Sequence, residues 1–196
     1  YINGFSENVK QIFMQFNFNK EIERMQDNNI LFIIMSSFSD INLSPNNVNH
    51  IEMGYIFRDL IRHFNELSSE INGEYITPPD IVKTMVSLLF KDNHNLSYNN
   101  NTSKEILDPT CGTGSMLIES INYLNNNYLN SKVNIFGQDS NPRSFAIASA
   151  STLMSRDPNK YYTSTIKLGD TLVNDQFKNK TFDYFISNPP FGISWN

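Results

Sequence analysis

The stretch DPTCGTGS, residues 108–115, decides the fold of this chain. It follows a short apolar segment, residues 105–107, that predicts a strand, and it precedes residues 116–124, whose apolar spacing predicts a helix. Gly112 and Gly114 permit a tight turn and let a ligand approach the backbone, while the helix start offers free N–H groups. A strand, a glycine turn and a helix in this order predict the first unit of an α/β fold with a binding site.

The same alternation continues on the C-terminal side of this stretch. Residues 133–136 predict a strand that ends in Asp139, and residues 144–154 predict an Ala-rich helix. Residues 165–168 and 182–187 predict two more strands. Strands that alternate with helices form right-handed βαβ units, so we expect a parallel sheet with its ligands at the carboxyl ends of the strands.

The first seventy residues predict helices. Apolar side chains keep a helical period from Ser6 to Phe16 and resume it at Ile22 and Met25, after an Asn-rich step at residues 17–19. A shorter helix fits residues 29–38. Ser44 followed by Pro45 is a helix-start signal, and residues 53–67 then carry apolar side chains along one face. We therefore expect a long amphipathic helix that begins near this signal.

The helical pattern breaks near Asn72. Beyond the break, Thr77 is expected to be the N-cap of a further helix that runs to Phe90. We place the domain boundary at the break, with a helical N-terminal region over residues 1–72 and an α/β domain over residues 73–196.

The glycine turn limits the kind of ligand. A dinucleotide fingerprint needs a third small residue where Leu117 stands and an acid about 20 residues on, whereas the next strand-end acid is Asp139. Asp108 at the strand end would also repel a phosphate. A cofactor that carries an amino acid and a ribose fits better, because Asp139 can accept both ribose hydroxyls. A turn that only joins a strand to a helix is the alternative, and the two glycines alone do not decide between them.

A second motif, FDYFISNPPFG, occupies residues 182–192. The Asn188 amide and the Pro189 carbonyl, on a turn stiffened by two prolines, can accept the two hydrogens of an exocyclic amine. Phe191 can stack on a flat base. A Pro-Pro stop after a strand, with Phe191 in the core, is the alternative.

Composition and charge exclude several other functions. The chain is 39% hydrophobic and 18% charged, which is enough to bury a core and unlike a disordered chain. The longest apolar run, Ile30–Met35, is too short to span a bilayer and no secretion signal begins the chain, so we expect a soluble cytoplasmic protein without membrane contact. The net charge of −5 argues against a broad grip on a phosphate backbone by this chain alone.

The single cysteine, Cys111, excludes an internal disulfide. With three scattered histidines it also argues against a zinc site, so no metal is expected. Its neighbours, Thr110 and Gly112, differ from those of the thiolate that methylates cytosine C5, and we interpret it as a small turn residue.

The two motifs resemble motifs I (DPTCGTG) and IV (NPPF) of the S-adenosylmethionine-dependent amino-methyltransferases of DNA. GEYITPPDIVKTMVSLL, residues 73–89, resembles their motif X, and this order is their gamma arrangement. Three further stretches together resemble the M (modification) subunit of type I restriction-modification systems: residues 22–25, 51–78 and 137–154. The likeness covers nearly the whole chain.

The resemblance implies the fold, the reaction and the partners. It implies a Rossmann-like methyltransferase domain whose parallel sheet is truncated at the C-terminus, so that the chain is a fragment and inactive alone. The reaction is transfer of a methyl group from S-adenosylmethionine to N6 of an adenine that has left the DNA duplex. The partners are DNA, a specificity subunit and a restriction or translocase subunit.

The resemblance also assigns the site residues. Asn188 and Pro189 accept from the target N6 amine while Phe191 stacks on the base, and the catalytic set is Asn188, Pro189, Pro190 and Phe191. Asp139, where the family often has Glu, binds the ribose, and Asp170 binds the cofactor's adenine amine. The residues assigned to the cofactor are Tyr75, Thr77, Pro78, Asp108, Pro109, Thr110, Gly112, Gly114, Ser115, Asp139 and Asp170.

Three other interpretations stay open. Protein-glutamine and ribosomal RNA methyltransferases share an NPP-aromatic turn, although they favour a D-L-G-x-G-like motif I. A solitary gamma-type adenine methyltransferase shares every catalytic motif. The third is a noncatalytic assembly module that binds partner helices.

Overall fold

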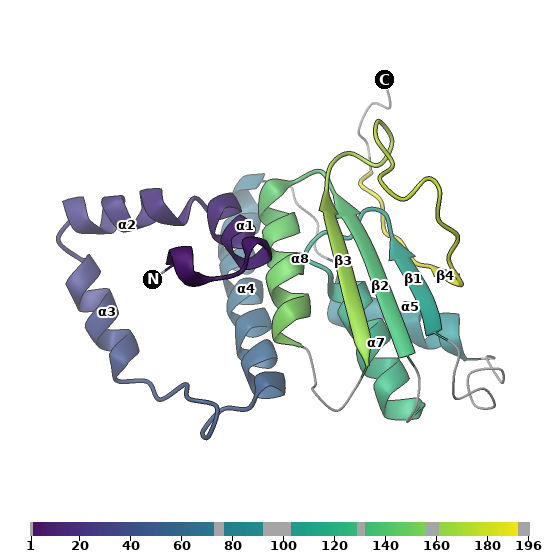
Figure 1. The fold of residues 1–196 in the computed structure, drawn as a ribbon, viewed down its shortest axis with the longest axis horizontal. Coiled ribbons are helices and arrows are strands. Elements are labelled where there is room, and N and C mark those ends of the chain that lie inside the picture. Colours follow the sequence, from purple (N-terminus) through teal and green to yellow (C-terminus); the bar gives the residue numbers. More distant parts are fainter. Residues whose placement is uncertain (1, 73–76, 92–102, 129–131, 156–160, 192–196) are drawn as a thin grey trace.

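The computed structural model describes residues 2–72, 77–91, 103–128, 132–155 and 161–191 (Figure 1). A helical N-terminal region precedes an α/β region, as the sequence predicts. After a short 3-10 helix, the elements are α1 (Glu7–Gln15), α2 (Phe18–Asp27), α3 (Leu31–Ser39), α4 (His50–Asn72), α5 (Pro79–Phe90), β1 (Ser103–Asp108), α7 (Ser115–Asn127), β2 (Lys132–Asp139), α8 (Pro142–Met154), β3 (Tyr162–Leu168) and β4 (Tyr184–Phe185).

The four strands form one parallel sheet in the order β3-β2-β1-β4. The chain runs from β1 through β2 to β3 and then returns to the other side of β1 for β4. Leu107 of β1 therefore lies between Phe136 of β2 and Phe185 of β4. The order reverses between β1 and β4, and open α/β sheets bind their ligands at such a switch point.

β4 is much shorter than the predicted strand over residues 182–187. Only Tyr184 and Phe185 have strand geometry. The backbone pairing with β1 nevertheless extends to both sides, because Asp183 N donates to Glu105 O and Ile186 N donates to Leu107 O, each at 3.0 Å.

One buried core joins the sheet to α5, α7 and α8. The Phe90 ring of α5 lies 5.6 Å from the Tyr123 ring of α7 and 4.9 Å from the Tyr184 ring of β4, measured between centroids. A Cβ added to Gly137 of β2 would lie 2.9 Å from both Cys111 Sγ and Leu117 Cδ1, so a side chain there would displace its buried neighbours. The ring contacts of Phe90 therefore hold α5, which precedes β1 in the chain, against α7, which follows β1.

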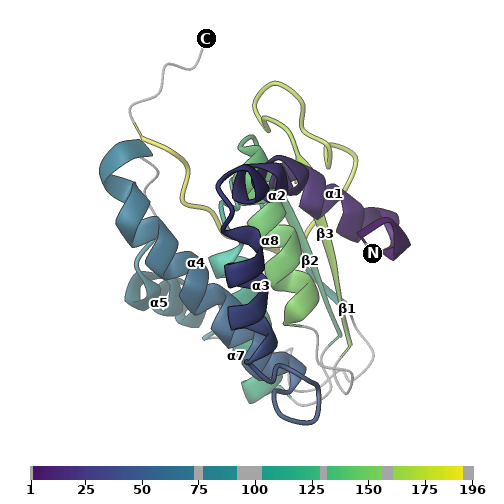
Figure 2. The ribbon, with the colours of Figure 1, turned by 90° about the vertical axis from the view of Figure 1, so that its left-hand side faces the viewer.

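The N-terminal helices pack on the same layer. Figures 1 and 2 both place α4 beside α8, and α1 also contacts α8. Ile12 of α1 is buried with Ala146 and Ala150 of α8. Arg58 of α4 donates from Nη1 to Ser155 Oγ at 2.7 Å. These contacts pack the two predicted regions against each other and do not test a boundary between them. The boundary at residue 72 therefore stays a prediction.

The helices α2 and α3 extend away from this layer as an arm (Figure 1). Neither helix contains a buried residue. Phe32 of α3 is 81% exposed. Within the described ranges, no helix is both long enough and apolar enough to cross a membrane.

The prediction that the long helix begins near Ser44 and Pro45 is wrong, because α4 begins at His50. Asn49 and Glu52 cap it reciprocally: Asn49 N donates to Glu52 Oε2 at 2.9 Å, and Glu52 N donates to Asn49 Oδ1 at 3.0 Å. Ser44 instead accepts at its backbone oxygen from Asn47 N and Val48 N, which makes a separate turn.

Candidate functional site

The glycine turn lies at the carboxyl end of β1, where the sequence places it. Gly112 and Gly114 have φ angles of +53° and +81°, both in the left-handed region that favours glycine. A Cβ on Gly114 would lie 3.2 Å from Ala148 Cβ of α8, whereas a Cβ on Gly112 would meet nothing within 4 Å. Gly114 therefore serves helix packing, and Gly112 presents its backbone to open space.

Asp139, at the end of β2, holds this turn. Its Oδ2 accepts from Gly112 N at 2.8 Å, and its Oδ1 accepts from Asn141 N at 2.9 Å. The Asn141 side chain in turn caps α8 by accepting from Arg143 N and Ser144 N. A carboxylate has about four lone-pair sites, so Asp139 keeps acceptor capacity for a further ligand.

Asp108, the last residue of β1, is a buried carboxyl group beside the turn. It is 2% exposed, and Thr110 N donates to its Oδ1 at 3.1 Å. Burial raises its pKa to about 7, while the Thr110 hydrogen bond acts in the opposite direction and the nearby Asp139 charge raises it further. At neutral pH the Asp108 carboxyl is therefore close to half protonated, and a positive charge nearby would favour its ionised form.

Cys111 is also buried in this corner. It is 5% exposed, and burial raises the pKa of its thiol well above the ordinary value. A thiol with a raised pKa is a poor nucleophile, because the reactive form is the thiolate. This burial agrees with the prediction that Cys111 is a turn residue.

The second motif lies directly beside the glycine turn. Ser187, which follows β4, places its Oγ 2.7 Å from Thr110 Oγ1, and either hydroxyl can be the donor. The two motifs are 77 residues apart in the chain at this contact. The carboxyl ends of β1 and β4, on the two sides of the switch point, are therefore joined by a side-chain hydrogen bond.

Asn188 contacts the start of α5. Its Nδ2 donates to Thr77 Oγ1 at 2.9 Å, across 111 residues of chain. The prediction that Thr77 caps α5 is wrong: Pro78 occupies the N-cap position and no side chain caps the helix. Pro78 is exposed next to this contact. Tyr75, the other predicted site residue here, lies outside the described residues.

The rest of the NPPF turn faces solvent. Phe191 is 79% exposed, and Pro189 and Pro190 are exposed as well. The alternative that places Phe191 in the core is therefore wrong for this chain. An exposed aromatic ring beside Asn188 is available for stacking.

Asp170 lies beyond β3 at the same edge of the sheet. It is exposed and accepts from Leu172 N at 2.9 Å. The next residue, Thr171, donates from Oγ1 to Pro109 O at 2.5 Å, which ties this loop to the glycine turn. The acids predicted from sequence, Asp108, Asp139 and Asp170, thus stand at the ends of three adjacent strands.

Sequence reasoning missed three polar residues that assemble this edge. Thr171 and Ser187 join neighbouring loops, as described above. Gln138 is fully buried; its Nε2 donates to Asn174 O at 2.8 Å and Gly169 O at 3.2 Å, and its Oε1 accepts from Gln176 N at 3.1 Å. A glutamine inside an apolar strand is a readable signal, because a buried amide needs partners.

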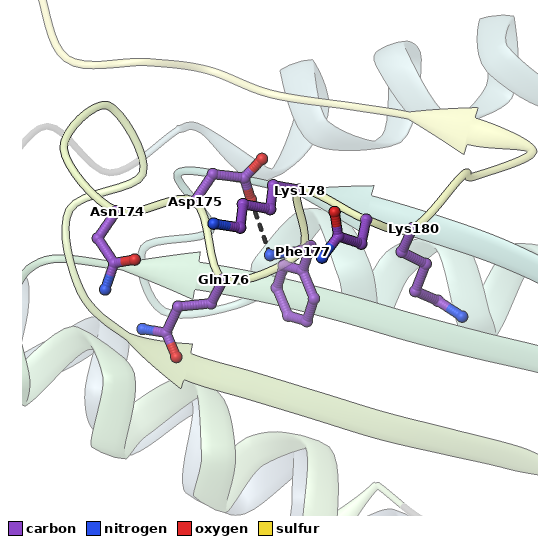
Figure 3. A pocket seen from close by; sticks show the side chains of 7 residues that line it. Asn174, Asp175, Gln176, Phe177, Lys178 and Lys180 are labelled. Carbon is purple, nitrogen blue, oxygen red and sulfur yellow. Dashed lines mark hydrogen bonds between the residues drawn. The ribbon is translucent and has the colours of Figure 1, made fainter.

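A separate shallow pocket, open to solvent, is lined by residues 174–180 (Figure 3). Its volume is about 460 Å³. Asp175 Oδ1 accepts from Phe177 N at 2.8 Å, and the Phe177 ring meets the Phe136 ring edge-on at 5.5 Å. The residues that line this pocket include none of the predicted site residues.

The comparison with family models matches residues 49–196 to the family described as N-6 DNA Methylase. Among curated proteins, the type I restriction enzyme MjaIX methylase subunit of Methanocaldococcus jannaschii is 24% identical over 169 residues, which is 86% of this chain and 28% of that protein. The MjaVII methylase subunit of the same organism is 29% identical over 162 residues, covering 71% of this chain and 26% of that protein. The chain spans less than a third of the length of these relatives.

Two solved structures share the fold. The type I restriction-modification methyltransferase subunit of Streptococcus thermophilus gives a TM-score of 0.64 at 21% identity, covering 86% of this chain and 33% of that one. A putative class I S-adenosylmethionine-dependent methyltransferase of Listeria monocytogenes gives 0.61 at 20% identity, covering 96% and 53%. These matches confirm the predicted fold class, and the curated relatives confirm the resemblance to type I methylase subunits.

Proposed function

Because the chain belongs to the N-6 DNA methylase family, we propose that it forms the cofactor-binding and base-binding part of an adenine-N6 DNA methyltransferase. The observation that carries this proposal is the 2.7 Å contact between Thr110 Oγ1 and Ser187 Oγ. It brings the glycine turn and the Asn188 turn to one switch point of the sheet, where a donor and an acceptor of a methyl group can meet.

The residues at this edge fit S-adenosylmethionine. Open space above Gly112 lets a ligand lie against the backbone, and the acids Asp108, Asp139 and Asp170 favour a cationic ligand with hydroxyl and amine groups over a phosphate. In this proposal Asp108 lies near the cofactor's ammonium, Asp139 binds its ribose and Asp170 its adenine amine. When bound, the sulfonium supplies an activated methyl group.

The second turn positions the amine. Asn188 Oδ1 and the Pro189 carbonyl accept the two hydrogens of the adenine N6 amine, and the Phe191 ring stacks on the extruded base. These acceptors favour the positive charge that builds on the nitrogen as it attacks, so no strong general base is needed. The backbone of this turn is fixed by the bond from Ile186 N to Leu107 O at 3.0 Å.

The proposal extends to partners, because this chain matches only part of each curated relative. The curated relatives are named as methylase subunits of type I restriction enzymes, and this chain covers 28% and 26% of the two described above. A net charge of −5 leaves most of the DNA backbone contacts to other parts of the assembly. We therefore propose a complex with a specificity subunit and a restriction or translocase subunit in the cytoplasm, and no activity of these 196 residues alone.

The test is Asn188→Ala in the full-length protein with its specificity subunit. We expect methyl transfer to DNA to fall at least about 100-fold, because the variant loses an acceptor that acts in the transition state. Binding of S-adenosylmethionine, measured by calorimetry, should stay within about twofold. The matched control is Asn179→Ala, in an exposed segment outside the site.

The methylated nucleoside is then identified by mass spectrometry. N6-methyladenine that disappears in the Asn188 variant supports the proposal. Near-normal transfer by that variant, or a methylated cytosine as the product, contradicts it. Normal methylation by the full-length protein without a specificity subunit would favour a solitary adenine methyltransferase.

A further inference from the structure

The hydroxyl of Thr77 makes a described hydrogen bond with Asn188. Asn188 Nδ2 donates to Thr77 Oγ1 at 2.9 Å. A threonine before a helix ordinarily caps it, but here Pro78 is the N-cap residue and no side-chain cap bond forms. The hydroxyl is therefore available to a residue 111 positions away.

Thr77 is held in a fixed place by the helix that follows it. Val86 and Phe90 of α5 are fully buried in the core of the α/β region. The backbone of Asn188 is fixed independently, because Ser187 bonds with Thr110 and Ile186 pairs with Leu107. Both partners of the Thr77–Asn188 bond thus belong to rigid parts of the molecule.

The remaining freedom of Asn188 is rotation of its amide. The final torsion of an asparagine side chain is broad and roughly two-fold, so a free amide exchanges its oxygen and nitrogen positions at little cost. An amine substrate offers N–H donors and requires the oxygen. If the Asn188 amide were rotated by half a turn, its NH2 group would face the NH2 group of the substrate. Neither group would then have an acceptor.

We propose that Thr77 is a positioning residue that anchors the Asn188 amide: its hydroxyl accepts from Nδ2, and the incoming amine, which offers N–H donors, keeps Oδ1 on its own side. The inference rests on the proposed function and deepens it. It gives the threonine of the TPP segment a function in base alignment, separate from any contact with the cofactor. The segment that precedes β1 in sequence thereby sets the geometry of the turn that follows β4.

The test compares Thr77→Val and Thr77→Ser in the full-length protein with its specificity subunit. Valine has the shape of threonine without the hydroxyl, and serine keeps the hydroxyl. We expect Thr77→Val to lower the single-turnover rate of methyl transfer roughly three- to tenfold, the effect of one hydrogen bond, with an unchanged dissociation constant for S-adenosylmethionine. Thr77→Ser should restore most of the rate.

The matched control is Thr84→Val on the same helix. Thr84 donates from Oγ1 to Asp80 O at 2.7 Å and lies on the exposed side of α5. Its substitution should leave the transfer rate unchanged. A similar loss in both variants would show a general effect on α5 and would contradict the inference.

Two further outcomes separate this inference from the proposed function. If Thr77→Val weakens cofactor binding and leaves the rate at saturation unchanged, Thr77 contacts the cofactor and the inference is wrong. If Asn188→Ala abolishes transfer while Thr77→Val has no effect, the inference alone fails. If Asn188→Ala is near normal, both fail.

Discussion

Asp139 Oδ2 accepts from the backbone N–H of Gly112 at 2.8 Å, so the acid at the end of β2 fixes the glycine turn at the end of β1. The same carboxylate binds Asn141 N at 2.9 Å and thereby reaches the start of α8. One side chain therefore links the glycine turn to the start of α8.

Replacement of this acid should cost stability as well as binding. Asp139→Ala removes the acceptor of two backbone N–H groups, and we expect the free energy of unfolding to fall by about 2 kcal/mol. Urea unfolding of the purified chain measures this change. Asp40→Ala, at an exposed position after α3, is the control. Equal stability of the two variants would mean that the turn does not depend on Asp139.

The raised pKa of Asp108 predicts a pH-dependent stability. Its pKa is about 7 in the folded chain, against an ordinary value of 3.8. Between these values the unfolded chain has lost the proton and the folded chain keeps it, so stability falls as the pH rises from about 4 to about 7. Asp108→Asn, which cannot ionise, should flatten this part of the profile.

Urea unfolding at about pH 5 and about pH 8 checks the prediction. The unsubstituted chain should lose roughly 2 to 3 kcal/mol more than Asp108→Asn over this interval. The other titrating groups are common to both chains and cancel in the comparison. Parallel profiles would contradict the assignment of the buried proton to Asp108.

The two glycines of the turn should respond differently to alanine. Gly114→Ala combines a left-handed φ with a contact of 3.2 Å to Ala148 Cβ, and we expect a loss of about 2 kcal/mol in stability. Gly112→Ala carries only the backbone cost, about 1 kcal/mol, but fills the space above the turn.

Thermal unfolding and a cofactor titration separate these effects. Gly112→Ala should lower cofactor affinity more than Gly114→Ala does. Gly114→Ala should lower thermal stability more than Gly112→Ala does. Gly4→Ala is the control, because its Cβ would meet nothing within 4 Å. Similar behaviour of the two turn variants would contradict the division of roles between them.

Gln138→Leu should loosen the loop that carries Asp170. Leucine has a similar size but leaves Gly169 O, Asn174 O and Gln176 N without their described partner. We expect a loss of about 2 to 3 kcal/mol and faster amide hydrogen exchange in residues 169–176. Gln26→Leu, at an exposed position of α2, should change neither measurement.

Much of the α/β region could be predicted, because its signals are local. Each described strand from β1 to β3 contains the apolar run that predicts it, and the acids Asp108 and Asp139 mark two strand ends. The start of α4 was readable in principle from the N-x-x-E pattern at Asn49 and Glu52. The Ser-Pro signal at residue 44 belongs to a separate turn.

The contacts that join distant segments could not be predicted from local patterns. N-cap preferences describe neighbours in sequence, so they assign Thr77 to α5 and carry no information about Asn188. Alternation of strands and helices predicts a parallel sheet but not the order of its strands. The position of β4 beside β1 could therefore not be predicted. The roles of the individual site residues in binding cofactor and base stay predictions.

The placement of β4 has a consequence for how the molecule is made. A chain emerging from the ribosome exposes α5 and the three strands from β1 to β3 before Tyr184 appears. The hydrogen bond between Gly112 and Asp139 can therefore form before the Asn188 turn has left the ribosome. If the proposed function is right, the cofactor site would thus form before the base site in each newly made copy.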